Sequence, residues 1–123
     1  MTARPTQLER IGRIALGLPE AMRVDIEAWG GEPTFRVRGK NFVFAAADGT
    51  SITVKLPHDE AAAVVAEVPD AAPTGYGLGR HGWVTVALGQ LDDGRWQEVE
   101  EWIETSYTLV APKSLARRVL ERD

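Results

Sequence analysis

The residue types best suited to recognition chemistry lie in one glycine-rich segment, residues 75–83, which reads Gly-Tyr-Gly-Leu-Gly-Arg-His-Gly-Trp. Glycine allows a positive φ or a close approach of the backbone to another segment. Arg80, His81 and Trp83 add a fixed positive charge, a titratable ring and a large aromatic surface. Such a group can bind an anion or stack against a ring. We therefore interpret the segment as a recognition surface, and no reaction follows from it.

The spacing of Gly75, Gly77 and Gly79 is similar to that of a nucleotide-binding loop, but its context differs. A dinucleotide fingerprint follows a strand and opens a helix, whereas the alternating pattern of a strand, Val84–Leu88, follows these glycines. We therefore expect no nucleotide loop here. His81 is expected to hold the turn through a hydrogen bond to a backbone carbonyl.

Catalytic groups have little support in the rest of the chain. Asp25 and Glu27 share one strand face and have the types needed for acid and base catalysis, yet neighbouring arginines make charge compensation the simpler interpretation. The serines lack the elbow motif of hydrolases, and His58 and His81 lack the spacing of metal ligands. The chain contains no cysteine, which excludes disulfides and a cysteine nucleophile. We expect a non-enzymatic protein with no cofactor and no metal.

Length and composition favour one globular domain over residues 1–123, because 44% of the residues are hydrophobic and 26% are charged. No apolar run reaches the roughly 20 residues needed to cross a bilayer, and the first five residues lack the apolar core of a signal peptide. We expect no membrane partner and a cytoplasmic location. The formal net charge of −4 opposes non-specific binding to polyanions but leaves room for a local basic face.

Sequence periodicity predicts a helix and then four antiparallel strands in the first half of the chain. Thr6–Glu9 reads as a capping box, and the helix is predicted over Gln7–Leu16. Alternation of apolar and polar residues predicts strands over Val24–Ala28, Phe35–Val37, Phe42–Ala46 and Ile52–Leu56. The tight connections are predicted at Gly39-Lys40-Asn41 and at Asp48-Gly49.

The middle of the chain is predicted to contain a short helix, a loop and a fifth strand. The helix begins at Pro57-His58-Asp59-Glu60 and is closed by Pro69. Asp70–Pro73 is predicted to be a loop, and the strand is predicted over Trp83–Leu88.

Two helices are predicted at the end of the chain. The first starts at Asp92-Asp93 and exposes acidic side chains, and Tyr107–Ala111 is predicted to cross in extended form. The second begins at Pro112 and turns Leu115, Val119 and Leu120 inward. The complete order of elements predicts an α+β fold, in which helices cover one face of an antiparallel sheet.

Pleat alternation divides the predicted sheet into a core face and an outer face. The core face is predicted to carry Val24, Phe35, Phe42, Phe44, Ile52, Val54, Val84 and Val86. The outer face is predicted to carry Asp25, Glu27, Arg36, Arg38, Thr53, Lys55, Trp83 and Thr85. This outer face has two interpretations: a solvated surface with cross-strand ion pairs, or a docking face for a nucleic acid, a peptide or a small acid.

Lys113 is predicted to lie in the first turn of the last helix, where the positive end of the helix dipole disfavours a cation. This placement favours a reason beyond local stability, such as an anion or a carboxylate partner. Lys113 is therefore a further candidate binding residue.

Five blocks of residues follow one another in an order that is specific when they are taken together. They are Leu16-Gly17-Leu18-Pro19-Glu20, Trp29-Gly30 with Pro33-x-Phe35-x-Val37-x-Gly39-Lys40-x-Phe42, Lys55-Leu56-Pro57, Leu78-Gly79-Arg80-His81-Gly82-Trp83-Val84 and Ser106-Tyr107-x-Leu109-Val110-Ala111-Pro112-Lys113. From about Leu16 to Leu115 the chain resembles the MmcQ/YjbR family of small bacterial proteins. The resemblance implies an α+β fold similar to CyaY or secretion-chaperone folds, and DNA binding through a double-wing arrangement of hairpins. It implies no catalytic residues, and its basic and aromatic hairpin positions would be Arg36, Arg38, Lys40, Lys55, Arg80 and Trp83.

Three functions are considered, of which the third, an enzyme, has the least support. The other two use one set of candidate residues: Arg36, Arg38, Lys40, Lys55, Arg80, His81, Trp83 and Lys113. The first is a DNA-binding module that binds weakly and with strong salt dependence. The second is an adaptor that binds a protein or an acidic small molecule on the sheet face or at the glycine-rich bend. Convergence of the cations on one patch would favour nucleic acid, whereas pairing of each cation with Asp25, Glu27 or Glu32 would weaken that hypothesis.

Overall fold

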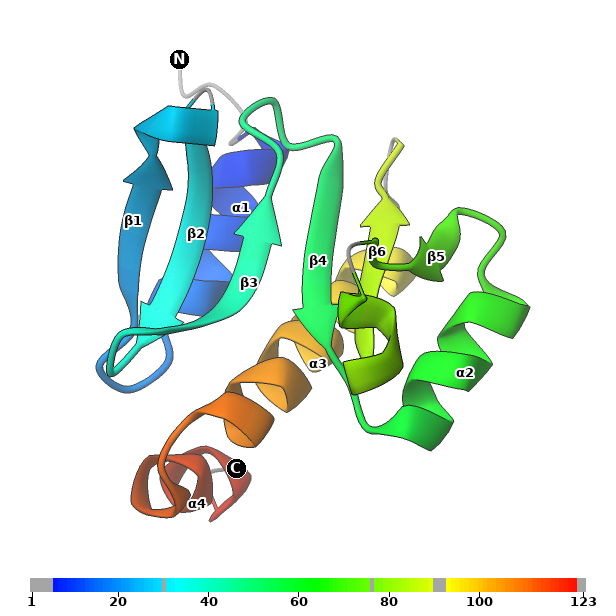
Figure 1. The fold of residues 1–123 in the computed structure, drawn as a ribbon. Helices are drawn as coiled ribbons and strands as arrows, with labels where there is room; N and C mark the ends of the chain where they lie inside the picture. Colours follow the sequence, from blue (N-terminus) through cyan, green and yellow to red (C-terminus); the bar gives the residue numbers. More distant parts are fainter. Residues whose placement is uncertain (1–5, 30, 76, 90–92, 122–123) are drawn as a thin grey trace.

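The computed structural model describes residues 6–29, 31–75, 77–89 and 93–121, and these residues have an α+β fold (Figure 1). One antiparallel sheet has the strand order β1-β2-β3-β4-β6-β5. Its strands are β1 (Met22–Ile26), β2 (Glu32–Val37), β3 (Lys40–Ala45), β4 (Ser51–Lys55), β5 (Ala71–Pro73) and β6 (Trp83–Ala87). The helices are α1 (Gln7–Leu16), α2 (His58–Glu67), α3 (Asp93–Val110) and α4 (Lys113–Glu121), with short 3-10 helices η1 (Glu27–Trp29) and η2 (Leu78–His81).

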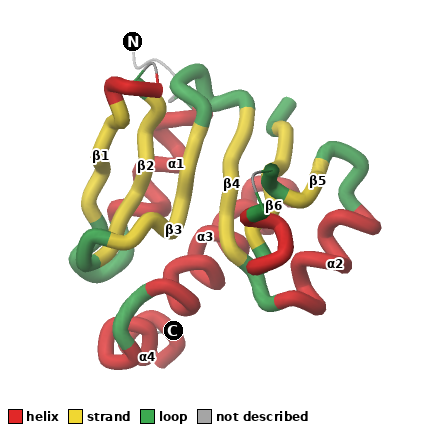
Figure 2. Tube along the Cα trace, viewed as in Figure 1, coloured by secondary structure: helices red, strands yellow, loops and turns green. Residues whose placement is uncertain are grey.

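Two helices cover one face of the sheet. Helix α1 contacts β1 and β2, and α3 contacts β3 and β4. Helix α2 packs beside the edge formed by β5 and β6, and α4 packs on α3. In Figures 1 and 2 the face of β1 to β4 turned toward the viewer carries no long helix. The predicted fold class is therefore confirmed, and one face of the sheet is open.

The core lies between this sheet and the helices behind it. Ile11, Phe35, Ile52 and Tyr107, which come from four different elements, are each fully buried. The inward residues of α3, such as Val99 and Ile103, are also buried. In the part of the chain that the structure describes, no helix combines the length and apolar character that a membrane span needs.

A β-bulge in β3 changes the predicted faces of the sheet. Phe35 pairs with Val43 and Arg36 pairs with Asn41, so Phe42 is an extra residue on β3. Phe42 and Val43 consequently both point into the core, and both are fully buried. The prediction that Phe44 lies on the core face is wrong, because the bulge shifts the alternation by one residue and turns Phe44 to the outer face.

Two connections also differ from the prediction. Asp70–Pro73 is not all loop, because Ala71–Pro73 forms the edge strand β5 on β6. Proline is tolerated there since an edge strand has one side without hydrogen bonds. The turn between β2 and β3 is formed by Arg38 and Gly39, both with positive φ, so Lys40 and Asn41 belong to the strand instead.

The predicted end of α3 is wrong, because Tyr107–Ala111 was expected to be extended and α3 runs to Val110. Tyr107 to Val110 continue α3 as helix, because Tyr107 packs edge-on against Phe42 and donates a hydrogen bond to the Pro19 carbonyl at 2.6 Å. These tertiary contacts favour helix over the extended form that β-branched residues prefer. In α4, Leu115 and Val119 are buried as predicted, but Leu120 is 73% exposed because it lies outside the stripe that packs on α3.

Helix α1 begins and ends as predicted, and this gives a simple test of its cap. The Thr6 hydroxyl accepts a hydrogen bond from the Glu9 N–H at 3.0 Å. Thr6→Ala should lower the free energy of unfolding by about 1 kcal/mol, because an N–H in the first turn loses its partner. Urea denaturation measures this change, with Thr6→Ser as the control that keeps the acceptor. An equal loss in both variants would contradict a capping role.

Candidate functional site

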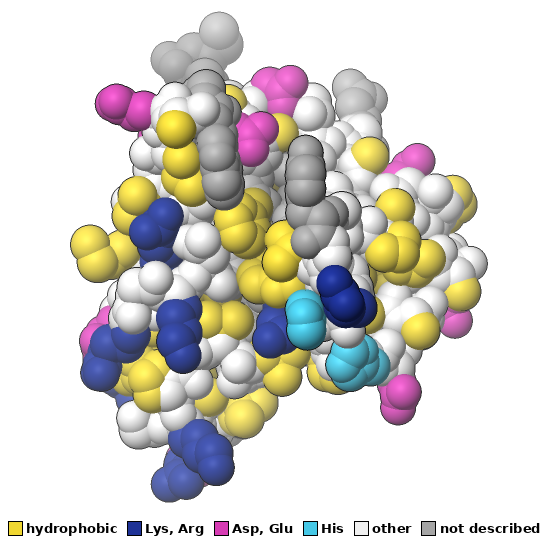
Figure 3. Space-filling model, in the orientation of Figure 1, with side chains coloured by type: hydrophobic (Ala, Val, Ile, Leu, Met, Phe, Trp, Pro, Cys, Tyr) yellow, Lys and Arg dark blue, Asp and Glu magenta, His cyan; other side chains and the backbone are white. Residues whose placement is uncertain are grey.

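The strand order brings the candidate residues to one end of the sheet. Strands β2 and β4 end at Val37 and Lys55, and their antiparallel neighbours β3 and β6 begin at Lys40 and Trp83. Arg80 and His81 lie in η2, just before β6, and Lys113 begins α4 at the same end (Figure 1). We call this set the basic end: Arg36, Arg38, Lys40, Lys55, Arg80, His81, Trp83 and Lys113. In Figure 3 most basic side chains and the histidines lie in the lower half of the visible face, while most acidic side chains lie near its outline.

Glycines shape the bend that carries Arg80 and His81. Gly77 and Gly82 flank η2 with φ of 79° and 89°. The Gly82 carbonyl accepts a hydrogen bond from the Leu56 N–H at 2.9 Å, and a Cβ on Gly82 would clash with the Leu56 carbonyl oxygen. The glycines therefore fold the bend tightly against the end of β4.

The prediction that His81 holds the turn through a hydrogen bond to a backbone carbonyl is wrong. Backbone hydrogen bonds close this turn, such as the one from the Gly82 N–H to the Gly79 carbonyl at 3.1 Å, and the Arg80 Nε donates to the Gly77 carbonyl at 3.3 Å. The His81 side chain is exposed and makes no hydrogen bond with the described residues. Its ring is therefore available at the surface.

Trp83 lies on the open face of the sheet, outside the core. It pairs with Lys55 across β4 and β6, and its ring meets that of Phe44 edge-on with centroids 5.4 Å apart. Its side chain is half-buried. The sequence placed Phe44 on the wrong face, and only the bulge in β3 brings it here. The core-face prediction for Val24 is also wrong, because Val24 lies opposite Thr34, which pairs with Phe44. Together the two rings form a small aromatic surface next to Lys55.

The cations of the basic end differ in their partners. Arg38 donates two hydrogen bonds to the Glu20 carboxylate, from Nε at 2.6 Å and Nη2 at 2.9 Å. These bonds hold the pKa of Glu20 below its usual value and raise the pKa of Arg38. Arg36 donates from Nε to the Thr34 hydroxyl at 3.2 Å.

The predicted cross-strand ion pairs with the acids of β1 are not found. Asp25 pairs with Arg23 on its own strand, at 2.8 Å. Among the described residues no carboxylate forms an ion pair with any of the remaining cations of the basic end: Arg36, Lys40, Lys55, Arg80 and Lys113. Four of these, with Lys113 the exception, belong to the hairpin positions that the resemblance implies.

The basic end contains two separate groups of residues. Arg36, Lys55, Arg80 and Trp83 lie on or beside the open sheet face. The other three cations, Arg38, Lys40 and Lys113, line one cavity together with the junction between α3 and α4. We call this second site the junction cavity.

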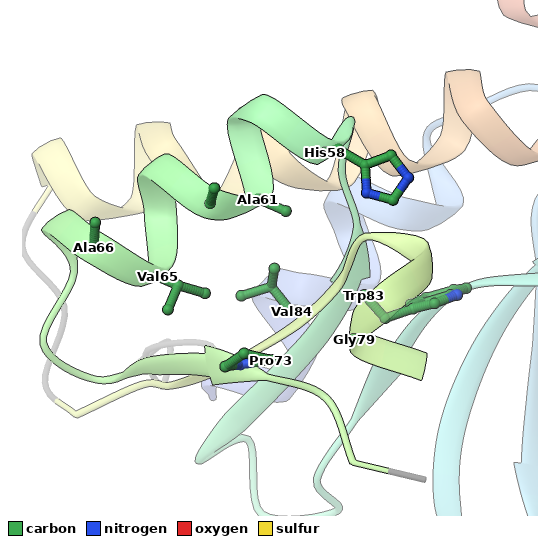
Figure 4. A pocket seen from close by; sticks show the side chains of 9 residues that line it. His58, Ala61, Val65, Ala66, Pro73, Gly79, Trp83 and Val84 are labelled. Carbon is green, nitrogen blue, oxygen red and sulfur yellow. The ribbon is translucent and has the colours of Figure 1, made fainter. Parts of the chain in front are cut away.

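A second hollow adjoins Trp83. It is a groove of about 340 Å³ between α2 and the strands β5 and β6. Figure 4 shows Val65, Val84 and Pro73 directed into this space, with His58 and Trp83 at one end. Its lining is mostly apolar, and across the described residues no three His, Asp or Glu side chains are placed to hold a metal ion.

These features define a small α+β domain with an open antiparallel sheet face, bounded at one end by basic and aromatic side chains. A family model described as YjbR matches residues 16–109. The chain belongs to the YjbR family, in agreement with the resemblance seen in the sequence. No curated protein matches the chain.

Proposed function

We propose that this protein is a non-enzymatic, cytoplasmic module that binds DNA weakly through the basic end. The observation that supports the proposal is the set of cations without carboxylate partners around the half-buried pair Trp83 and Phe44 on the open sheet face. Arg36, Lys55 and Arg80 would neutralise phosphates, and Trp83 would stack on a base. A partly exposed aromatic ring suits unpaired bases, so single-stranded DNA is expected to bind at least as tightly as duplex.

The acidic residues of α3 do not oppose this proposal. Helix α3 turns Trp96, Val99 and Ile103 toward the core, so its exposed acids, such as Glu98 and Glu101, point away from the sheet. Because α3 covers the face opposite Trp83, these acids lie on the other side of the molecule from the aromatic pair. The net charge of −4 is thus compatible with a basic surface at one end of the sheet.

Fluorescence anisotropy with labelled single-stranded and duplex DNA at two salt concentrations tests the proposal. Lys55→Ala and Arg80→Ala should each weaken binding and reduce the salt slope for single strands by about 0.7, because one phosphate contact is lost. Trp83→Leu should weaken binding about five-fold or more through lost stacking. Arg13→Ala is the matched control, since it removes one exposed cation from α1, behind the sheet. Anisotropy that stays flat at low salt and at tens of micromolar protein would overturn the proposal.

The groove beside Trp83 supports a second candidate function, an adaptor that binds a protein or an acidic small molecule. Its volume of about 340 Å³ is within the range of small-ligand sites, and His58 stands at one end of it. A thermal-shift screen with small carboxylic acids tests this candidate. If none raises the melting temperature and no protein is retained from a lysate, the adaptor hypothesis fails.

A further inference from the structure

The junction cavity is a second place where positive charge converges. It has a volume of about 450 Å³. Its walls come from the β2–β3 turn, the last turn of α3, the link to α4 and the first residue of α4: Arg38, Lys40, Leu109, Val110, Ala111, Pro112 and Lys113. The apolar residues form one side, and the three cations enter from two distant parts of the chain. The tertiary fold therefore builds a pocket that contains cations but no acid in its lining.

The three cations of the pocket outnumber the carboxylates that form ion pairs with them among the described residues. Glu20 offsets Arg38, whereas Lys40 and Lys113 form no ion pair with a described carboxylate. About two positive charges thus remain uncompensated, and this value matches the charge of a phosphate monoester near neutral pH, about −1.5 to −2. A carboxylate has one negative charge and would leave about one of these positive charges uncompensated.

Arg38 keeps hydrogen-bond donors for a ligand. A guanidinium has five N–H donors, and Glu20 engages one on Nε and one on Nη2. The ion pair therefore fixes the plane of the guanidinium while the rest of its donors stay open. Arginine held in this way is suited to bind the oxygens of phosphate.

The backbone on both sides of this ion pair is held in an unfavourable conformation. Glu20 and Arg38 have φ of 59° and 51°, and among the described residues they are the only non-glycine residues with positive φ. Such conformations persist where the surrounding structure holds them, and they cluster at functional sites. Here they place the Arg38 side chain at the cavity.

Helix ends contribute opposite partial charges to the pocket. Lys113 occupies the first turn of α4, which has no acidic residue, and the preceding Pro112 offers no side-chain cap. A bound anion would offset this unfavourable cation at the positive helix end. The carbonyl end of α3 carries a partial negative charge, which disfavours an anion in the pocket. One of its carbonyls, that of Tyr107, already accepts a hydrogen bond from the Ala111 N–H at 2.8 Å.

We propose that the junction cavity binds a dianionic phosphate monoester, with Lys40, Lys113 and the open donors of Arg38 as its ligands. The phosphate can be free in solution or the terminal phosphate of a nucleotide. This site is separate from the sheet-face residues assigned to DNA, so either proposal can fail without the other.

Titrations followed by amide chemical shifts test this site with inorganic phosphate, adenosine 5′-monophosphate, adenosine and acetate. Phosphate should give saturable shifts at residues 38–40 and 110–114 with a Kd on the order of 1 mM. Tighter binding of the monophosphate would identify a nucleotide as the source, and equal binding would identify free phosphate. No saturable shift with either, or equal affinity for acetate, would overturn the proposal.

Matched variants separate the cavity from general electrostatics. Lys40→Gln combined with Lys113→Gln should weaken phosphate binding about ten-fold, because two charged ligands are lost. Arg10→Gln, combined with Arg13→Gln, removes two exposed cations of α1 that lie outside both the cavity and the sheet face, and should change phosphate binding less than about two-fold. Comparable losses in both double variants would show that no localised site exists.

Discussion

Gly82→Ala is expected to lower the free energy of unfolding by about 3 kcal/mol or more, a large share of the 5 to 15 kcal/mol of a typical domain. Gly82 has a φ of 89°, which an L side chain rarely adopts. A Cβ there would also clash with the backbone carbonyl of Leu56, which cannot rotate away as a side chain could. The hydrogen bond between the Leu56 N–H and the Gly82 carbonyl, at 2.9 Å, holds the two segments together.

Two other glycines serve as controls for this prediction. Gly39 has a φ of 80° and nothing near the position that a Cβ would take. Gly39→Ala should therefore lower the free energy of unfolding by about 1 kcal/mol, through the strained backbone conformation alone. Gly75 has open space and no positive φ, so Gly75→Ala should be nearly neutral. Urea denaturation of the three variants gives the comparison. If Gly82→Ala were no more harmful than Gly39→Ala, the close approach to Leu56 would have no energetic weight.

Ser106→Ala should lower the free energy of unfolding by about 2 to 3 kcal/mol. The hydroxyl of Ser106 donates to the Phe42 carbonyl at 2.6 Å and accepts from the Lys55 N–H at 2.8 Å. It is fully buried, so alanine would leave two backbone groups of adjacent strands without their partner. Ser106 thereby joins α3 to the bulge of β3 and to the end of β4.

The control for Ser106 is the exposed Ser114 in the first turn of α4. Ser114→Ala should change the free energy of unfolding by less than about 0.5 kcal/mol. The midpoint and slope of urea unfolding distinguish the two variants. Equal midpoints would contradict the role of Ser106 as a buried link between the helix and the sheet.

Elements with strong local signals were predicted correctly from the sequence. The helix N-cap at Thr6, the hairpin turn at Gly49 and the alternation of β4 and β6 are all found where expected. Weak local signals led to errors. The strand β5 has three residues, and the end of α3 is decided by the contacts of Tyr107 rather than by its propensity.

The sequence predicted which residues belong to the candidate site, but not all of their partners and directions. Antiparallel order alone implies that the ends and starts of neighbouring strands share one edge, which explains why Lys40, Lys55 and Trp83 lie at the same end. The partner of Arg38 was not predictable, because Glu20 is 18 residues away and approaches through the packing of the preceding turn. Phe44 reaches the outer face only because of an irregular residue in β3.

By itself the sequence determined the α+β class, the order of most elements and the types of side chain available for binding, because these depend on periodicity, turns and composition over a few residues. Only the tertiary structure decided which cations are paired, which aromatic ring accompanies Trp83 and that Arg38, Lys40 and Lys113 share a cavity. The physical reason is that a one-residue bulge and contacts between distant segments set the direction of side chains, and neither has a local signal in the chain.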